Sequence, residues 1–257
     1  MPKPKIKELI FIAIIIFIIL FSLTNSGLAI AAKQMTAEEI MKKRDENEYI
    51  QSAYAEVTMI ISKGGRRIEK NMVMYSREKD AFVEFINPGD RGTRFLKRDD
   101  NIWMFFPDAE EIVKISGHML EQGFMGSDFS YQDMMEFDKL TDLYTFAILE
   151  EDTFNERLCY VLEAIAIPGK KVSYYRRVTW IDKERFVGLK EELFAESGRL
   201  LKVSEVQEIE EIEGHWLPVQ SIMENKLRKN TYTQAIINKI ELAPELDDRI
   251  FSLQSLR

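Results

Sequence analysis

The side chains that could carry out acid–base or nucleophilic chemistry lie close together in one stretch of this sequence. His118, one of only two histidines, is followed by Ser127 and Asp128 within "GFMGSDFSYQDMM". A serine, a histidine and an acid are the residue types of a hydrolytic triad. These three lie in one predicted loop with no element to orient them, and "MGSDF" lacks the second glycine of a nucleophile elbow. A lipid hydrolase is therefore the weakest of the functions that we consider.

Metal and cofactor motifs are missing from the sequence. The second histidine, His215, stands beside Trp216, and the single cysteine, Cys159, lies in the apolar run "RLCYVLEAIAI". We find no H-E-x-x-H, no paired cysteines, no calcium loop and no glycine-rich phosphate loop. We therefore expect no metal, no cofactor and no enzymatic activity, and we expect Cys159 to be a buried strand residue.

Two clusters of basic residues invite the question of an anionic ligand. "YYRRVTW" places Arg176 and Arg177 on opposite faces of a predicted strand, where one could line a cavity mouth. "GGRRIEK" is typical of a charged hairpin end. A surface role is the simpler interpretation of both.

Composition indicates a folded protein that does not bind nucleic acid. Hydrophobic residues make up 46% of the chain and charged residues 30%, which is enough apolar material for a core. The net charge is −8, whereas phosphate backbones require a basic face.

The first 32 residues have the three parts of a secretory signal peptide. Three lysines within the first seven residues precede an uncharged apolar run, residues 9–23, and then "TNSGLAIAA". We predict cleavage after Ala31 or Ala32, export to the periplasm, and a single domain over residues 33–257. An uncleaved inner-membrane anchor is the alternative, although the run is short for a span of about 20 residues. No cysteine stands at the cleavage point to carry a lipid.

The remainder of the chain is dominated by strand patterns. Thr36 and Glu39 form a capping box that predicts a helix at the start. From Ser52 to about residue 243 the apolar residues alternate, and turns such as Gly64-Gly65 recur every 8 to 12 residues or so. This is the spacing of an antiparallel meander of about a dozen strands. Because a flat sheet of that width would curl, we expect one curved sheet or partial barrel.

Residues 116–140 interrupt the strands. Ser130 and Asp133 fit a second capping box, which predicts a short helix that runs to about Phe137 or Leu140. Gly123 and Gly126 precede it and give the backbone the freedom of a hinge. Such a helix could lie across the sheet as a mobile lid or as a fixed plug.

Large, flexible apolar side chains are abundant, with 16 phenylalanines and 12 methionines. They could form an ordinary core, or they could line a concave face that repacks around apolar ligands. From strand alternation we predict a set of ligand-lining residues: Met59, Phe82, Phe95, Trp103, Phe105, Met125, Phe129, Tyr131 and Met134.

One continuous segment carries a family resemblance. Residues 85–134 contain a strand that ends in P-x-x-x-G, followed by "FL", "IWMFFP" and "GSDFSYQDM". As a set, these motifs resemble the outer-membrane lipoprotein-sorting proteins of the LolA/LolB superfamily. The resemblance implies a mainly β fold, an unclosed antiparallel barrel of about 11–12 strands with helices covering its opening, and an apolar cavity for acyl chains.

The function that we predict is a monomeric periplasmic carrier or chaperone. It would bind acyl chains of lipoproteins or other lipids and move them toward the outer membrane, between an inner-membrane exporter and an outer-membrane acceptor. The alternative is a sensor, regulatory module or exporter accessory with the same fold.

Overall fold

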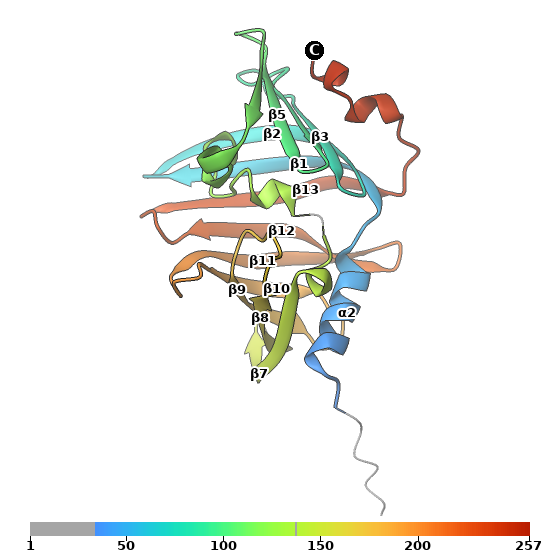
Figure 1. Ribbon diagram of the computed structural model, residues 1–257, viewed down its shortest axis with the longest axis vertical. Helices are drawn as coiled ribbons and strands as arrows, with labels where there is room; N and C mark the ends of the chain where they lie inside the picture. Colours follow the sequence, from blue (N-terminus) through green and yellow to red (C-terminus); the bar gives the residue numbers. More distant parts are fainter. Residues whose placement is uncertain (1–33, 137) are drawn as a thin grey trace, which may run out of the picture. The chain divides into compact units, whose positions relative to one another are not determined.

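The computed structural model describes residues 34–136 and 138–257 (Figure 1). The predicted signal peptide, residues 1–32, lies outside the described residues. Residues 36–257 form one unit with its own core.

The helix predicted at the start is present as α2, Ala37–Glu48. The Thr36 hydroxyl accepts a hydrogen bond from the Glu39 amide at 3.2 Å, and the Glu39 carboxylate accepts one from the Thr36 amide at 2.8 Å. Both bonds of the capping box are therefore formed, and this prediction is confirmed. The helix buries Ile40 and Met41.

Thirteen strands follow, compared with the 11–12 expected. Their bounds are β1 (Ser52–Lys63), β2 (Arg66–Arg77), β3 (Asp80–Phe85), β4 (Arg94–Arg98), β5 (Asn101–Phe106), β6 (Glu111–Ile115), β7 (Tyr144–Phe154), β8 (Arg157–Ala166), β9 (Arg176–Asp182), β10 (Gly188–Phe194), β11 (Leu200–Ile212), β12 (His215–Asn225) and β13 (Thr231–Leu242). They form one sheet in the order β6-β5-β4-β3-β2-β1-β13-β12-β11-β10-β9-β8-β7. Every ladder is antiparallel, for example β1 with β2 and β1 with β13.

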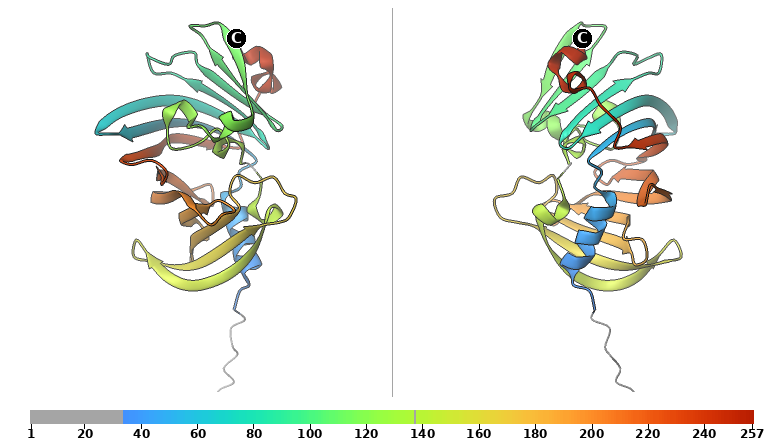
Figure 2. Two further views of the ribbon diagram at one scale, coloured as in Figure 1. Left: turned by 60° about the vertical axis from the view of Figure 1, so that its left-hand side comes forward. Right: turned by 90° about the vertical axis from the view of Figure 1, so that its right-hand side faces the viewer.

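The sheet is curved but not closed, as predicted. Its edges are β6 and β7, and no ladder joins them in the described part of the chain. These two strands are consecutive in sequence, so the connection over residues 116–143 must cross from one edge to the other. Figure 2 shows this connection on the concave side of the sheet.

The helix predicted from Ser130 toward residue 140 is wrong in extent. Its capping bonds do form: the Ser130 amide donates to Asp133 at 2.7 Å, and the Asp133 amide donates to the Ser130 hydroxyl at 3.2 Å. Only one 3₁₀ turn follows, however, at Asp133–Met135. The crossing favours extended backbone because a strand advances about 3.3 Å per residue and an α-helix only about 1.5 Å. The prediction for Phe137 lies outside the described residues.

The crossing segment consists of loops and 3₁₀ turns: η1 (Gly117–Glu121), η2 (Phe124–Gly126), η3 (Asp133–Met135) and η4 (Leu140–Asp142). Two further turns at the C-terminus, η5 (Asp248–Phe251) and η6 (Leu253–Leu256), pack on the opposite face of the sheet, against Phe82 and Leu96. Short turns thus cover both faces of the first strands.

Candidate functional site

One continuous face of the sheet, here called the inner face, carries the candidate site. Residues directly opposite each other in an antiparallel ladder point to the same side. Successive opposite partners on neighbouring strands, from β1 to β9, place the following residues on one side of the sheet: Ile61, Thr233, Met223, Ser204, Glu191 and Thr179. The inner face therefore runs without interruption from β1 to β9.

The first half of the inner face is apolar. A row of methionine, phenylalanine and branched side chains forms a surface that we call the groove bed: Met59, Ile61, Met72, Val83, Phe85, Phe95, Ile102, Met104 and Ile115. All nine are buried. A surface of this kind can hold an acyl chain only if whatever covers it leaves.

The cover is residues 117–135, which we call the plug. Phe124 lies at its centre and is 1% exposed. Its ring lies 5.7 Å from Phe85, 5.4 Å from Phe95 and 5.6 Å from Tyr131, with the last two contacts edge to face. Five other apolar side chains of the plug pack on the bed while only partly buried: Met119, Leu120, Met125, Phe129 and Met134. The plug thus takes the place that an apolar ligand would fill.

A tight turn aims Phe124 at the groove bed. A Cβ on Gly123 would stand 2.2 Å from the Ser127 carbonyl oxygen, so only glycine fits there. Met125 adopts φ 50° and Gly126 φ 83°, both in the left-handed region. The two glycines expected to give hinge freedom therefore shape this turn.

Asp128 fastens the plug to β13. Its carboxylate accepts hydrogen bonds from the Thr231 hydroxyl at 2.9 Å and the Thr233 hydroxyl at 2.8 Å. Its amide donates to the Thr233 oxygen at 2.9 Å. Asp128 is 2% exposed, so these bonds form away from water and hold the plug in place.

The hydrolytic trio considered from the sequence is not assembled. The Ser127 hydroxyl donates to the Phe129 carbonyl at 3.2 Å, and Asp128 is engaged by the two threonines. His118 lies in η1, and no hydrogen bond joins it to Ser127 or Asp128 among the described residues. Within residues 34–136 and 138–257 there is also no group of three or more metal-ligating side chains, and no helix long and apolar enough to cross a membrane.

The nine predicted ligand-lining residues fall on two faces. Six of them, namely Met59, Phe95, Met125, Phe129, Tyr131 and Met134, belong to the groove bed or the plug. The other three, Phe82, Trp103 and Phe105, pack on the opposite face with the C-terminal turns. On β3 and β5 the inward residues are Val83, Phe85, Ile102 and Met104, so the alternation was read one residue out of phase there. Their contact with a ligand stays a prediction.

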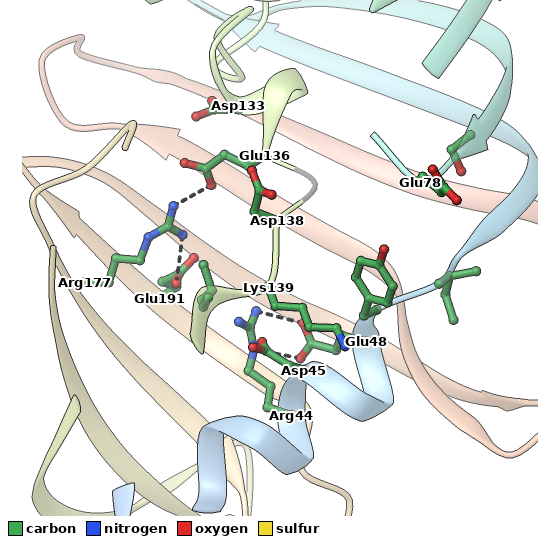
Figure 3. Close-up of a pocket in the computed structure, with 14 residues that line it drawn as sticks. Arg44, Asp45, Glu48, Glu78, Asp133, Glu136, Asp138, Lys139, Arg177 and Glu191 are labelled. Atoms are coloured by element: carbon green, nitrogen blue, oxygen red, sulfur yellow. Dashed lines mark hydrogen bonds and ion pairs between the residues drawn. The ribbon is translucent and has the colours of Figure 1, made fainter. Parts of the chain in front are cut away.

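The second half of the inner face is charged, and Arg177 is its centre (Figure 3). This side chain is 4% exposed, so the surface role favoured for it from the sequence is wrong. Its guanidinium contacts Glu136 at 2.5 Å and Glu191 at 3.2 Å, and its Nε donates to the Tyr144 hydroxyl at 3.0 Å. Burial alone would lower the pKa of Arg177, but the carboxylates of Glu136 and Glu191 raise it well above its ordinary value.

A second pair from α2 lies beside this centre. Arg44 and Glu48 are 2.8 Å apart at their closest charged atoms, and Glu48 also accepts the Gly188 amide of β10 at 2.7 Å. Burial raises the pKa of Glu48, against the opposing effects of Arg44 and the Gly188 amide. The carboxylate of Asp45, also on α2, accepts hydrogen bonds from both the amide and the hydroxyl of Thr141. The helix is thus fixed to the sheet by directional polar contacts.

Asp133 connects the end of the plug to this charged half. It accepts the Tyr174 hydroxyl and the Lys202 ammonium group, each at 2.5 Å. Burial and the Asp133 carboxylate raise the pKa of Tyr174, which keeps the phenol protonated. The two hydrogen bonds of the predicted Ser130–Asp133 box are formed, but no local pattern indicates these two distant partners of Asp133.

These groups surround a cavity of about 440 Å³, which is lined by Arg44, Asp45, Glu48, Tyr49, Ile50, Ser76, Glu78, Asp133, Glu136, Asp138, Lys139, Leu140, Arg177 and Glu191 (Figure 3). Seven of the lining residues are acids and three are bases. The cavity is therefore polar, and it is unsuited to an acyl chain because the buried charges would lose solvation without gaining partners.

Comparison with known proteins agrees with this geometry. Residues 77–257 match a family model described as "Uncharacterized protein". The chain is 26% identical to a DUF1329 family protein from Desulfovibrio piger, with a TM-score of 0.79, covering 86% of this chain and 98% of that one. It is 25% identical to a domain from Vibrio parahaemolyticus assigned to outer membrane lipoprotein sorting, with a TM-score of 0.75 and coverage of 86% and 97%.

A third solved structure shares the fold. It is a LolA superfamily protein from Nitrosomonas europaea, 23% identical, with a TM-score of 0.71 and coverage of 86% of this chain and 100% of that one. No curated protein matches the chain. The unclosed 13-stranded sheet with its covered inner face is the fold that the chain shares with these structures, among them the lipoprotein-sorting domain and the LolA superfamily protein. The chain belongs to the family whose model matches residues 77–257.

Proposed function

We propose that the protein is a periplasmic carrier or chaperone that accepts an acyl chain of a lipid or lipoprotein on the groove bed. The observation that carries this proposal is the seating of Phe124, and of the partly buried side chains around it, on nine buried apolar residues. The plug occupies that surface as a set of separate apolar contacts, which a long hydrocarbon chain can replace one by one.

The energies of the two occupants are comparable. Each buried methylene contributes about 0.8 kcal/mol, so one long acyl chain contributes roughly 10 kcal/mol. Each large apolar side chain of the plug contributes about 1.5–3 kcal/mol when fully buried, and less when only partly buried. Because the plug has two buried and five partly buried apolar side chains, its removal costs about as much as an acyl chain returns. Reversible loading and release require that the free energy of removing the plug nearly balances the free energy gained by burying the acyl chain.

The predicted signal peptide and one relative support the place of action that we propose. A cleaved leader would deliver the domain to the periplasm, and one relative is assigned to outer membrane lipoprotein sorting. We infer a route between an inner-membrane exporter and an outer-membrane acceptor. The chemistry proposed here is binding only, since a groove bed of hydrocarbon side chains offers no reacting group.

The test combines recovery of bound lipid with direct uptake. Native mass spectrometry and lipid extraction of the purified protein should find a bound lipid or acylated peptide. A fluorescent fatty acid should bind to the wild type and bind about tenfold more weakly to Met59→Gln, which places an amide in the groove bed. Leu158→Gln is the matched control, because Leu158 is 65% exposed and lies away from the bed. Absence of lipid together with absence of uptake would overturn the proposal.

A further inference from the structure

A second cavity, at the tips of two hairpins, has the lining of an anion site. It measures about 590 Å³ and lies between the β1–β2 turn and the β12–β13 turn, and its lining includes Ser62, Lys63, Arg66, Arg67, Lys226 and Arg228. Five of these six residues are cationic. The one carboxylate in the lining, Glu224, is already paired with Lys226.

The other four cations of this cavity are not neutralised by the protein. Among the described residues, Lys63, Arg66, Arg67 and Arg228 form no ion pair, and all four are exposed. They are gathered in a chain whose net charge is −8. Four like charges around one cavity repel each other, and an anion entering it would relieve that repulsion.

Ser62 provides an independent sign of a ligand. It is only 8% exposed, and its buried hydroxyl oxygen has no hydrogen-bond partner within the part of the chain that the structure describes. A buried polar atom without a partner costs free energy and is rare in folded proteins. Ser62 stands directly opposite Arg67 on β2 and Tyr232 on β13, so these three residues lie on the same face of the sheet. A phosphate oxygen bound by Arg67 could also accept the Ser62 proton.

Exposed apolar side chains at the same tips indicate where such a phosphate would come from. Leu227, in the β12–β13 turn, is 50% exposed, and Tyr232, which lines the cavity, is 42% exposed. Basic residues beside exposed aliphatic and tyrosine side chains suit the boundary between lipid headgroups and acyl chains. A free phosphate ion would gain nothing from these two side chains.

We propose that this cleft, between the β1–β2 and β12–β13 turns, docks the protein on an anionic lipid surface by binding a headgroup phosphate through Arg66, Arg67, Arg228 and Ser62. The guanidinium groups match phosphate geometry through paired N–H donors, and the hydroxyl of Ser62 completes the site. Docking of this kind does not depend on whether the groove bed carries cargo.

The test is co-sedimentation of the full chain with vesicles of phosphatidylglycerol and phosphatidylethanolamine, compared with vesicles of phosphatidylcholine. Arg66→Glu/Arg67→Glu should weaken binding to the anionic vesicles at least about tenfold. Lys170→Glu/Lys171→Glu makes the same change of charge in another exposed loop and should weaken it less than twofold. Because the N-terminal segment is common to all forms, the difference reports on the cleft. Equal loss in the two double variants, or equal binding to both kinds of vesicle, would overturn the proposal.

Ser62→Ala separates a ligand role from a structural one. It should weaken vesicle binding several-fold while leaving the Tm unchanged or slightly higher, since it removes an unpartnered buried hydroxyl. Unchanged vesicle binding would show that the hydroxyl is not part of the site. Two results would exclude a lipid surface as the occupant: binding of inorganic phosphate without binding of vesicles, and binding of an acidic protein alone. Fatty-acid uptake by Arg66→Glu/Arg67→Glu should equal that of the wild type, so a failure of docking is distinguishable from a failure of the carrier function.

Discussion

The two halves of the inner face are filled by different kinds of contact. Along β1–β6 the concave side is filled by hydrocarbon, with the plug seated on the groove bed. Along β9–β12 it is filled by buried ion pairs and hydrogen bonds around Arg177 and Arg44. Apolar contacts are non-directional and can be exchanged for an acyl chain at little net cost. A buried ion pair cannot be exchanged in this way, because removing one partner leaves the other charged and desolvated.

This difference assigns a separate task to each half. The apolar half is the one suited to a change of occupant. The charged half holds α2 and the end of the crossing segment in place, through Asp45, Glu136 and Asp133. The plug is therefore held through Asp128 and Asp133, while the side chains around Phe124 lie on a replaceable surface. Four changes would break or sharpen this comparison.

The largest effect is expected for Arg177→Met. It leaves Glu136 and Glu191 without their buried partner, so the free energy of unfolding should fall by about 3–5 kcal/mol. Urea denaturation measures the change. Adding Glu136→Gln to the variant should recover part of the loss, because one uncompensated charge is removed. A loss below about 1 kcal/mol would mean that the charged half does not anchor the structure.

Phe124→Ala should separate stability from binding. Removing a ring that is 1% exposed should lower the free energy of unfolding by about 3 kcal/mol. Under the proposed function the ring competes with cargo for the groove bed, so the affinity for a fluorescent fatty acid should rise. Phe95→Ala, in the groove bed itself, should lower stability similarly but lower that affinity. If both variants change the fatty-acid affinity in the same direction, the plug does not compete with the ligand for the groove bed.

Asp128→Asn should loosen the plug without loosening α2. The amide can no longer serve both threonine hydroxyls as a charged acceptor, so stability should fall by about 1–2 kcal/mol. Hydrogen exchange should become faster for the amides of residues 117–135 and stay unchanged in α2. Faster exchange in both regions would show that the two halves open together.

The smallest effect is a pH dependence in the charged half. Since burial raises the pKa of Glu48 in the folded state, folding favours its protonated form, and that contribution to stability is lost as the pH rises from the ordinary carboxyl range through the raised pKa. Glu48→Gln is uncharged at every pH. The stability of the variant relative to the wild type should therefore increase with rising pH across this window, as measured by thermal denaturation at several pH values. A relative stability that falls with rising pH would contradict burial as the main effect on Glu48.

Much of the fold was predictable because its signals are local. The Thr36–Glu39 capping box, the alternation of the strands and the Gly64-Gly65 turn each depend on a few neighbouring residues, and the predicted unclosed antiparallel barrel is confirmed. The Ser130–Asp133 box was also recognised, but the helix expected after it does not form. The segment that contains this box has to cross the sheet, because it connects the two edge strands β6 and β7.

The candidate site was predictable only in part. Six of the nine predicted ligand-lining residues lie on the groove bed or the plug, whereas Phe82, Trp103 and Phe105 lie on the other face. A shift of one residue reverses the facing of a strand, and no local signal in β3 or β5 distinguishes a core-facing phenylalanine from one covered by the C-terminal turns. The burial of Arg177 was missed for a different reason, because its partners Glu136 and Glu191 are distant in sequence.

The sequence by itself determined the elements: a capped helix, a long antiparallel meander, an interruption rich in methionine and phenylalanine, and a family resemblance carried by residues 85–134. Only the tertiary structure decided that one continuous face has an apolar half and a charged half, and that the interruption lies across it. Hydrogen bonding and alternation act between neighbours along the chain. Which face is inward, and which charges meet there, depends on how the sheet curves to bring distant strands together.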